Sequence, residues 1–94
     1  ALGDIEFDPL SGTLIRDGKQ TKLRNRELRL FEVFANAPDQ IFPKAKLLDR
    51  LFSYGEEVSE NAIEVYVGRL RRHLHGSNVE IQTVRGVGYM LHIQ

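Results

Sequence analysis

Hydrophobic and polar residues alternate with a period of two over the first part of the chain. Residues 4–8 read Asp-Ile-Glu-Phe-Asp and residues 13–16 read Thr-Leu-Ile-Arg, with turn-forming residues between them and Asp17-Gly18 after them. Alternation bounded by Gly, Pro, Asp and Ser is typical of short, half-buried strands. The pattern predicts a small antiparallel meander, which a third short strand over residues 20–23 completes.

From Asn25 the apolar positions recur about every 3.6 residues, which is the period of an α-helix. The stripe runs from Leu28 to near Asn36 and stops ahead of Pro38, so it predicts a first helix with one face in the core. A second helix is expected at Pro43, which suits a first turn because that turn leaves its N–H groups unpaired. The apolar positions of this second helix are Ala45, Leu47, Leu48, Leu51 and Phe52.

A third helix is predicted over residues 60–74, with Ser59 as its N-cap and Gly76 in the C′ position. Its core stripe is formed by Ile63, Val67, Leu70 and Leu74. Beyond it, β-rich runs at residues 79–84 and 89–93 enclose a glycine-bearing turn, which is the pattern of a β-hairpin. The order of sheet, three helices and hairpin predicts an α+β fold in one domain over residues 1–94.

Composition fits this picture and narrows the class of protein. The chain has 94 residues, of which 41% are hydrophobic and 28% charged, values typical of one globular domain and not of a disordered or membrane protein. There is no cysteine, so a disulfide framework and a Cys-ligated zinc site are excluded, and we expect a cytoplasmic location. The chain begins without Met or a signal peptide, so we expect it to be a piece of a longer protein.

The outward face of the third helix has an unusual mixture of side chains. At 100° per residue, it carries Asn61, Val65, Gly68, Arg69 and Arg72, flanked by Ala62 and Tyr66 on one side and by Glu64 and Arg71 on the other. Against DNA, Arg69 could pair with guanine, Asn61 with adenine or a phosphate, and Val65 with a thymine methyl. The alternative is that cations near a helix C-terminus merely complement the helix dipole.

Gly68 is the least expected residue on this face. Glycine inside a helix costs about 1 kcal/mol relative to alanine. Its outward position indicates either that the helix backbone approaches a partner closely or that the glycine is a neutral substitution at an exposed position. Both interpretations stay open.

The hairpin adds a second candidate contact. Thr83 and Arg85 are two residues apart and are expected on the same side, and the glycines at 86 and 88 make a narrow tip that could enter a minor groove. Arginine suits such a groove because the narrow groove concentrates negative potential. The alternative is an ordinary hairpin with an exposed arginine. Formal net charge is zero, so recognition of DNA would depend on where the charges lie and not on a basic surface overall.

At this point the sequence resembles the DNA-binding effector domain of OmpR/PhoB-type response regulators. The resemblance rests on Val58-Ser-Glu-Asn-Ala-Ile-Glu-Val-Tyr-Val-Gly-Arg-Leu-Arg-Arg-His-Leu74, on Ile81-Gln-Thr-Val-Arg-Gly-Val-Gly-Tyr89 and on the Leu23-x-x-x-Glu27 opening of the first helix. It covers essentially the whole chain. It implies a winged helix-turn-helix with a four-stranded antiparallel N-terminal sheet, a three-helix core and a C-terminal hairpin wing.

The resemblance also implies a function and a set of contacts. It implies sequence-specific binding to double-stranded DNA and regulation of transcription in a two-component system, with the helix at 60–74 in the major groove and the wing at 83–89 in the minor groove. The residues expected to approach DNA are Asn61, Ala62, Val65, Tyr66, Arg69, Arg71, Arg72, Thr83, Arg85 and Tyr89. A phosphate contact suits Arg71 better than a base contact, because it lies on a flank of the helix. In the loop between the second and third helices, Tyr54, Glu56 and Glu57 are candidates for contact with RNA polymerase.

The partners follow from the same resemblance. They are direct-repeat half-sites on DNA, a second copy of the chain bound head-to-tail, an N-terminal receiver domain that is absent from this chain, and a cognate sensor kinase. Three positions depart from the family pattern. Arg24 stands where a capping Thr is common, so either Asn25 caps the first helix or the start of the helix shifts by one residue. Gly68 replaces a residue that is often polar or basic, and Phe52 replaces a frequent Trp.

No catalytic pattern competes with this interpretation. The three histidines lack a carboxylate four residues away and a triad-like serine, and Gly86-x-Gly88 lacks the third glycine and the following helix of a dinucleotide loop. We therefore expect no enzyme activity, no cofactor, no metal and no membrane contact. The remaining rival is a winged helix that binds protein instead of DNA, which zero net charge would fit.

Overall fold

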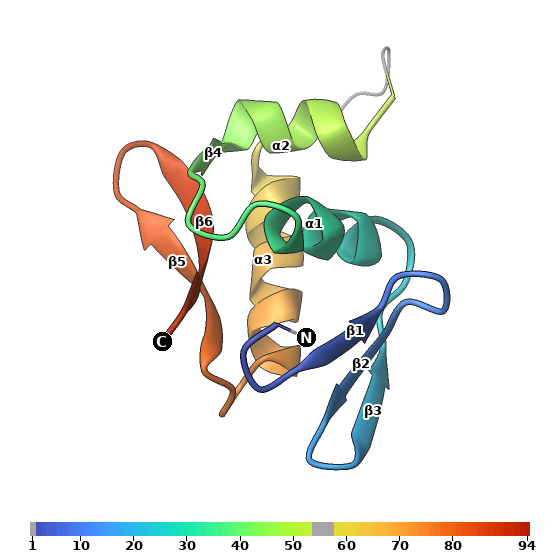
Figure 1. The fold of residues 1–94 in the computed structure, drawn as a ribbon. Helices are drawn as coiled ribbons and strands as arrows, with labels where there is room; N and C mark the ends of the chain where they lie inside the picture. Colours follow the sequence, from blue (N-terminus) through green and yellow to red (C-terminus); the bar gives the residue numbers. More distant parts are fainter. Residues whose placement is uncertain (1, 54–57) are drawn as a thin grey trace.

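The computed structural model describes residues 2–53 and 58–94. Along the chain, its elements are β1 (Glu6–Asp8), β2 (Thr13–Arg16), β3 (Lys19–Lys22), α1 (Asn25–Ala35), β4 (Phe42–Pro43), α2 (Lys44–Leu51), α3 (Asn61–His73), β5 (Val79–Val84) and β6 (Gly88–Ile93) (Figure 1). This is the predicted α+β order of sheet, three helices and hairpin. Within the described ranges, no helix is long and apolar enough to cross a membrane.

The N-terminal sheet has three antiparallel strands in the order β1-β2-β3. The meander predicted from alternation is confirmed, with Phe7 opposite Leu14 and Leu14 opposite Thr21. The four-stranded sheet implied by the family resemblance is wrong for this chain. Leu2 and Ile5 instead bond to each other, with N···O distances of 2.8 and 3.0 Å, so the backbone ahead of β1 closes into a tight turn and offers no further strand.

The first helix begins without the side-chain cap that sequence reasoning expected. Arg24 is the N-cap residue, with extended backbone and no side-chain bond to the helix, and Asn25 follows with a φ of 52°. Asn25 therefore neither caps the helix nor shifts its start. A positive φ is tolerated better by asparagine than by most residues, which makes Asn25 a suitable residue for this sharp entry.

The other two helices differ from prediction only at their ends. Pro43 is the N-cap of α2 and not part of its first turn, because it also belongs to strand β4. The third helix spans Asn61–His73, one residue less at each end than predicted, and its N-cap is Glu60 instead of Ser59. Gly76 has a φ of 85°, which ends the chain's helical path two residues after the C-cap Leu74.

The C-terminal sheet has the order β4-β6-β5, and its third strand was not predicted. In β4, Phe42 pairs with Tyr89 and Pro43 with Gly88. A Cβ atom at Gly88 would lie 2.0 Å from the carbonyl oxygen of Phe42, so only glycine lets the two strands approach this closely. We call β5, β6 and the turn Arg85–Val87 between them the wing.

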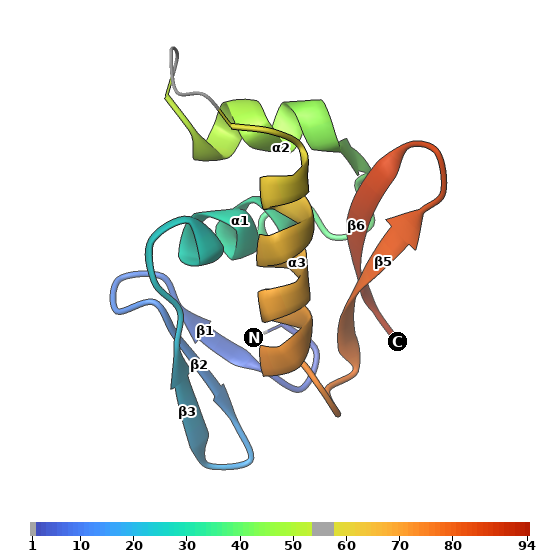
Figure 2. The same ribbon diagram turned by 180° about the vertical axis from the view of Figure 1, so that it is seen from behind.

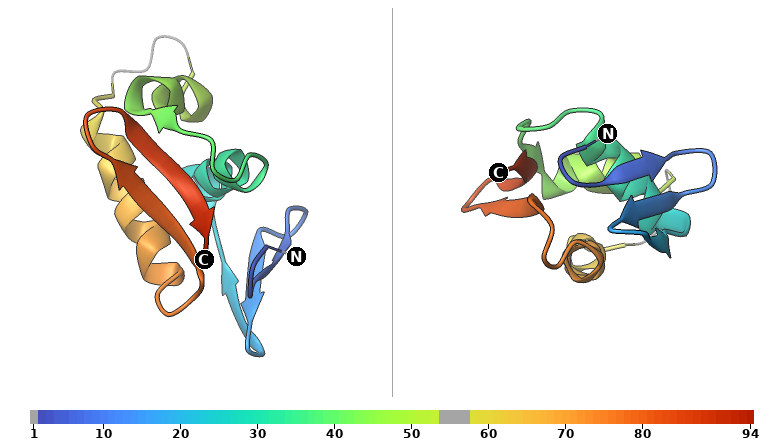
Figure 3. Two further views of the ribbon diagram at one scale, coloured as in Figure 1. Left: turned by 60° about the vertical axis from the view of Figure 1, so that its left-hand side comes forward. Right: turned by 60° about the horizontal axis from the view of Figure 1, so that its bottom comes forward.

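The helices hold the core between the two sheets. Phe31 and Phe34 of α1 are fully buried, and their rings pack edge-on against Phe7 at 4.9 Å and Phe42 at 5.8 Å, so α1 joins both sheets. The inner face of α3 packs into the same core through its buried residues Ile63, Val67 and Leu70. In Figure 2, α3 is the element nearest the viewer, and no other element lies over it. The wing runs beside α3, and the N-terminal sheet lies apart from the wing (Figure 3). The outer face of α3 is thereby left uncovered.

Candidate nucleic-acid interface

The outward face of α3 is exposed as the helical spacing predicted. Asn61, Arg69 and Arg72 are exposed, and Val65 is 51% exposed despite its apolar side chain. On the flank, Ala62 and Tyr66 are half-buried. An apolar side chain among polar and cationic ones on a bare helix face is suited to contact with base edges, where thymine methyl groups and hydrogen-bonding atoms alternate.

Arg69 is oriented by its neighbour Tyr66. The guanidinium carbon of Arg69 lies 5.5 Å from the centre of the Tyr66 ring, and that ring lies 6.5 Å from the ring of Phe52. The guanidinium carbon of Arg26 in turn lies 4.4 Å from the centre of the Phe52 ring. These two rings, with a cation at each end, connect α1, the residue after α2 and α3, so the half-buried Tyr66 supports Arg69 from the flank of the helix.

The side chain of Arg71 is hydrogen-bonded to the wing. Its Nε and one terminal nitrogen donate to the carbonyl oxygen of Ile81 at 3.0 and 2.8 Å, and the same nitrogen donates to Oγ1 of Thr83 at 2.9 Å. Its guanidinium also lies 5.7 Å from the ring of Tyr89. The expected phosphate contact of Arg71 therefore competes with a role that the sequence did not reveal, which is to fix the wing against α3.

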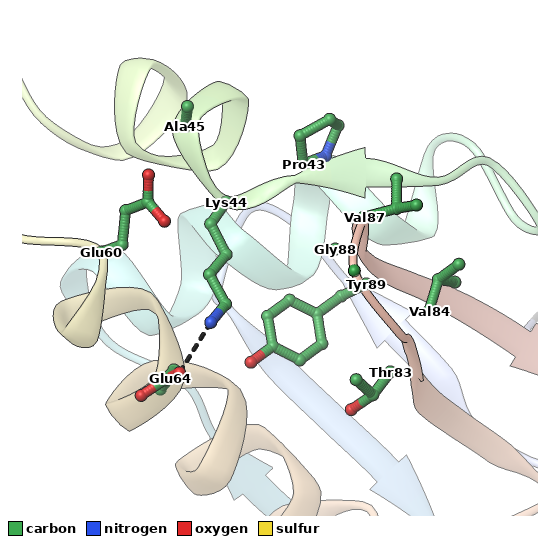
Figure 4. Close-up of a pocket in the computed structure, with 11 residues that line it drawn as sticks. Pro43, Lys44, Ala45, Glu60, Glu64, Thr83, Val84, Val87, Gly88 and Tyr89 are labelled. Carbon is green, nitrogen blue, oxygen red and sulfur yellow. Dashed lines mark hydrogen bonds and ion pairs between the residues drawn. The ribbon is translucent and has the colours of Figure 1, made fainter.

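The three predicted residues of the wing, Thr83, Arg85 and Tyr89, differ in position and in exposure to solvent. Thr83 is exposed on β5, but Arg85 lies in the turn beyond the end of that strand at Val84, so the strand alternation used to place the two on one side does not extend to Arg85. Arg85 is exposed at the tip. Tyr89 is only 6% exposed, and its hydroxyl points toward α3 (Figure 4), which makes it a supporting residue first.

A cleft of about 480 Å³ separates the first turn of α3, the start of α2 and the wing (Figure 4). Across it, Nζ of Lys44 bonds to Oε1 of Glu64 at 2.6 Å. This hydrogen bond raises the pKa of Lys44 above its usual value. Nζ also lies 6.0 Å from the centre of the Tyr89 ring. Sequence analysis missed Lys44 altogether, although a lysine at the start of the second helix and an acidic residue on the flank of the third were visible signals.

The other candidate residues named from the sequence do not belong to this interface. The polymerase-contact candidates Tyr54, Glu56 and Glu57 lie outside the described residues. Two histidines do contact carboxylates, but ones distant in sequence: His73 meets Glu27 at 2.9 Å and His92 meets Asp39 at 2.8 Å. Over residues 2–53 and 58–94, no group of three or more potential metal ligands is found.

Comparison with known proteins decides the family. Residues 18–91 match the model of the family described as transcriptional regulatory protein, C terminal. The chain belongs to this family. The resemblance to OmpR/PhoB-type response regulators is thereby confirmed, and the family is one of transcriptional regulators and not a class of enzymes.

Two relatives of this transcriptional-regulator family are similar over nearly the whole chain. A probable transcriptional regulatory protein, y4xI of Sinorhizobium fredii, is 40% identical over 98% of this chain and 42% of its own length. The phosphate regulon transcriptional regulatory protein PhoB of Rhizobium meliloti is 38% identical over 95% of this chain and 40% of its own. The chain thus spans well under half the length of these relatives.

Among solved structures, the DNA-binding domain of RstA from Klebsiella pneumoniae, in complex with the RstA box, is similar. It superposes with a TM-score of 0.78 at 25% identity, covering 98% of this chain and 94% of that one. The winged-helix architecture predicted for the chain is confirmed by this likeness together with the observed order of elements.

Proposed function

We propose that this chain binds double-stranded DNA in a sequence-specific manner, with α3 in the major groove and the tip of the wing in the adjacent minor groove, and so regulates transcription. The observation that carries the proposal is the exposed face of α3, where Asn61, Val65 and Arg69 lie side by side above a fully apolar inner face. The exposed Arg85 at the tip of the neighbouring wing supports it. The RstA domain, a structural neighbour, is described in complex with DNA.

Each residue of the proposed interface has a role that its position suits. Arg69 pairs with guanine through two parallel hydrogen bonds, Asn61 bonds to adenine or a phosphate, and Val65 packs on a thymine methyl. Arg85 enters the minor groove. The remaining members contact phosphates or lie close to the backbone and are Ala62, Tyr66, Arg72 and Thr83. Arg71 and Tyr89 act mainly by holding the wing beside α3.

Local charge favours this use of a neutral chain. The chain has 13 basic and 13 acidic residues, but α3 carries three arginines against one glutamate. Because phosphate attraction falls off within about 10 Å at moderate salt, the charges of the contacting elements matter more than the total. A neutral total also predicts weak binding to DNA of arbitrary sequence.

The substitution Arg69→Ala tests the proposal directly. Bound sequences are first selected from a random duplex pool, and variants are then compared by mobility shift on the selected site and on single-base changes of it. We expect Arg69→Ala to lose roughly 1–3 kcal/mol of binding free energy and to relax the preference at one base pair. We expect Arg85→Ala to weaken binding with less effect on sequence preference.

Lys19→Ala is the matched control, because it removes one positive charge from the exposed start of strand β3, in the N-terminal sheet, which is no part of the proposed interface. It should bind like the parent. If Arg69→Ala and Arg85→Ala also bind like the parent, the assignment of the interface is wrong. If the pool yields no enriched sequence at all, a protein-binding winged helix is the better account.

The setting of the whole protein is part of the proposal. We infer that an N-terminal receiver domain, phosphorylated by a sensor kinase in the cytoplasm, brings two copies together on direct-repeat half-sites. Relatives more than twice as long as this chain are consistent with a further domain. RNA polymerase is a proposed partner of the segment between α2 and α3.

A further inference from the structure

Lys44 and Glu64 form an ion pair at a place where a bound duplex would pass. Lys44 is the first residue of α2 and Glu64 lies in the first turn of α3, and their side chains meet across the cleft beside the wing (Figure 4). The side chain of Lys44 is 31% exposed and that of Glu64 is 50% exposed, so solvent reaches both groups. An incoming anion could therefore replace the carboxylate without opening the core.

The proposed docking fixes which part of DNA faces this cleft. With α3 in the major groove and the wing tip in the neighbouring minor groove, the sugar-phosphate backbone that separates the two grooves must run between α3 and the wing. The cleft lies there, and its walls include Lys44, Glu64, Thr83 and Tyr89. Lys44 is the single cation among the described residues that line it.

The acidic residues of the cleft are out of place beside a phosphate backbone. Glu60 and Glu64 both line the cleft, and each would repel a phosphate. Only Glu64 is bonded to Lys44, at 2.6 Å. Its carboxylate offers the same chemistry as a phosphate oxygen, a negatively charged acceptor of a lysine hydrogen bond.

We propose that Lys44 is a phosphate-binding residue and that Glu64 occupies its phosphate position in the free domain. A DNA phosphate displaces Glu64 when the duplex binds, and the displaced carboxylate stays nearby and opposes binding. Glu64 therefore lowers affinity for DNA of any sequence, since the contact it competes with is to the backbone and not to a base. This inference rests on the proposed function.

The test is a salt series with a matched pair of neutralising substitutions. Binding to a duplex of arbitrary sequence is followed by fluorescence anisotropy at several salt concentrations, for the parent, Glu64→Gln and Glu60→Gln. Both substitutions remove one negative charge from the cleft, but only the first releases Lys44. We expect Glu64→Gln to bind more tightly than Glu60→Gln, with a plot of log affinity against log salt steeper by up to about 1.

The two substitutions are then repeated with Lys44→Met, or with Lys44→Gln if circular dichroism shows that the methionine variant is less well folded. The excess gain of Glu64→Gln over Glu60→Gln should disappear. The proposal is overturned if the two glutamine variants gain equally, if the excess survives without Lys44, or if Glu64→Gln changes sequence preference, which would make Glu64 a reader of bases. Failure of the parent to bind even its selected site would overturn the proposed function instead.

Discussion

Gly68 shows how a residue that is awkward for a helix can be judged once its surroundings are known. A Cβ atom added at Gly68 would meet nothing within 4 Å, so the fold does not require glycine there. We expect Gly68→Ala to raise the free energy of unfolding by about 0.5–1 kcal/mol, measured by urea denaturation, because alanine loses less backbone entropy in a helix. A destabilised variant would contradict this.

The same variant separates the two interpretations of Gly68. Weaker binding of Gly68→Ala to the selected site, in a protein that is more stable than the parent, would indicate that the helix backbone approaches DNA closely. Unchanged binding would indicate a neutral substitution at an exposed position.

Asp4 gives a pH dependence that can be assigned to one carboxylate. It accepts hydrogen bonds from the hydroxyl of Ser77 and the backbone N–H of Asn78, and mainly the bond from Ser77 lowers its pKa below the ordinary 3.8. A lowered folded-state pKa stabilises the protein above pH 3.8, and this contribution is lost as pH falls through the folded-state value. We expect Asp4→Asn to be less stable than the parent at pH 5 and to lose less stability on acidification.

Urea midpoints between pH 5 and pH 2 measure this difference. Asp17→Asn is the matched control, since Asp17 is an exposed turn residue with a positive φ of 52° that asparagine accepts equally well. Parallel curves of stability against pH for Asp4→Asn and the parent would show that the hydrogen bonds to the Asp4 carboxylate do not contribute to stability.

At the residue scale, the sequence predicted which side chains of α3 are exposed, but not which residues they bond to. Helical spacing placed Val65 and Arg69 outward correctly, because the spacing of a helix depends on local geometry alone. It placed Arg71 on a flank as well, but its bonds to Ile81 and Thr83 depend on how β5 docks against α3. The Lys44–Glu64 pair, which joins two helices, is hidden from the sequence for the same reason.

At the scale of elements, length decided which ones could be predicted. The helices and the hairpin are long enough for their periods to be recognised, whereas β4 has two residues and shows no alternation. The expected fourth N-terminal strand failed because it was carried over from the family and had no alternating pattern of its own. The ends of α3 and the start of α2 were displaced by a residue, since no side chain caps either helix.

Gly88 is the residue on which the small strand β4 depends. We expect Gly88→Ala to cost about 1–3 kcal/mol, because its Cβ would lie 2.0 Å from the Phe42 carbonyl oxygen and would push β4 away from β6. Thermal unfolding measures the loss. Gly86→Ala is the comparison: it has open space around it and only its φ of 78° to resist a side chain, so its loss should be smaller. Equal losses would mean that β4 is free to shift.

For the whole molecule, the question is whether the domain associates with itself before it meets DNA. Among described residues, the exposed large hydrophobic side chains come from separate segments of the chain and are Leu10, Ile41, Val58, Val65 and Val87. Isolated apolar residues of this kind are normal on a monomer, whereas a stable dimer needs a contiguous and well-packed patch. Val65 and Val87, moreover, lie on elements proposed to face DNA.

We therefore expect the isolated chain to be a monomer and to pair only on DNA. A single domain buries about 600–1,000 Å² on a half-site, so a lone half-site should hold it weakly, and two adjacent half-sites should bind two copies more tightly than either alone. Sedimentation velocity with and without such a duplex measures both states, and a single half-site is the control. A stable dimer without DNA would contradict the expectation, because pairing would then precede DNA binding and would not require the receiver domain to drive it.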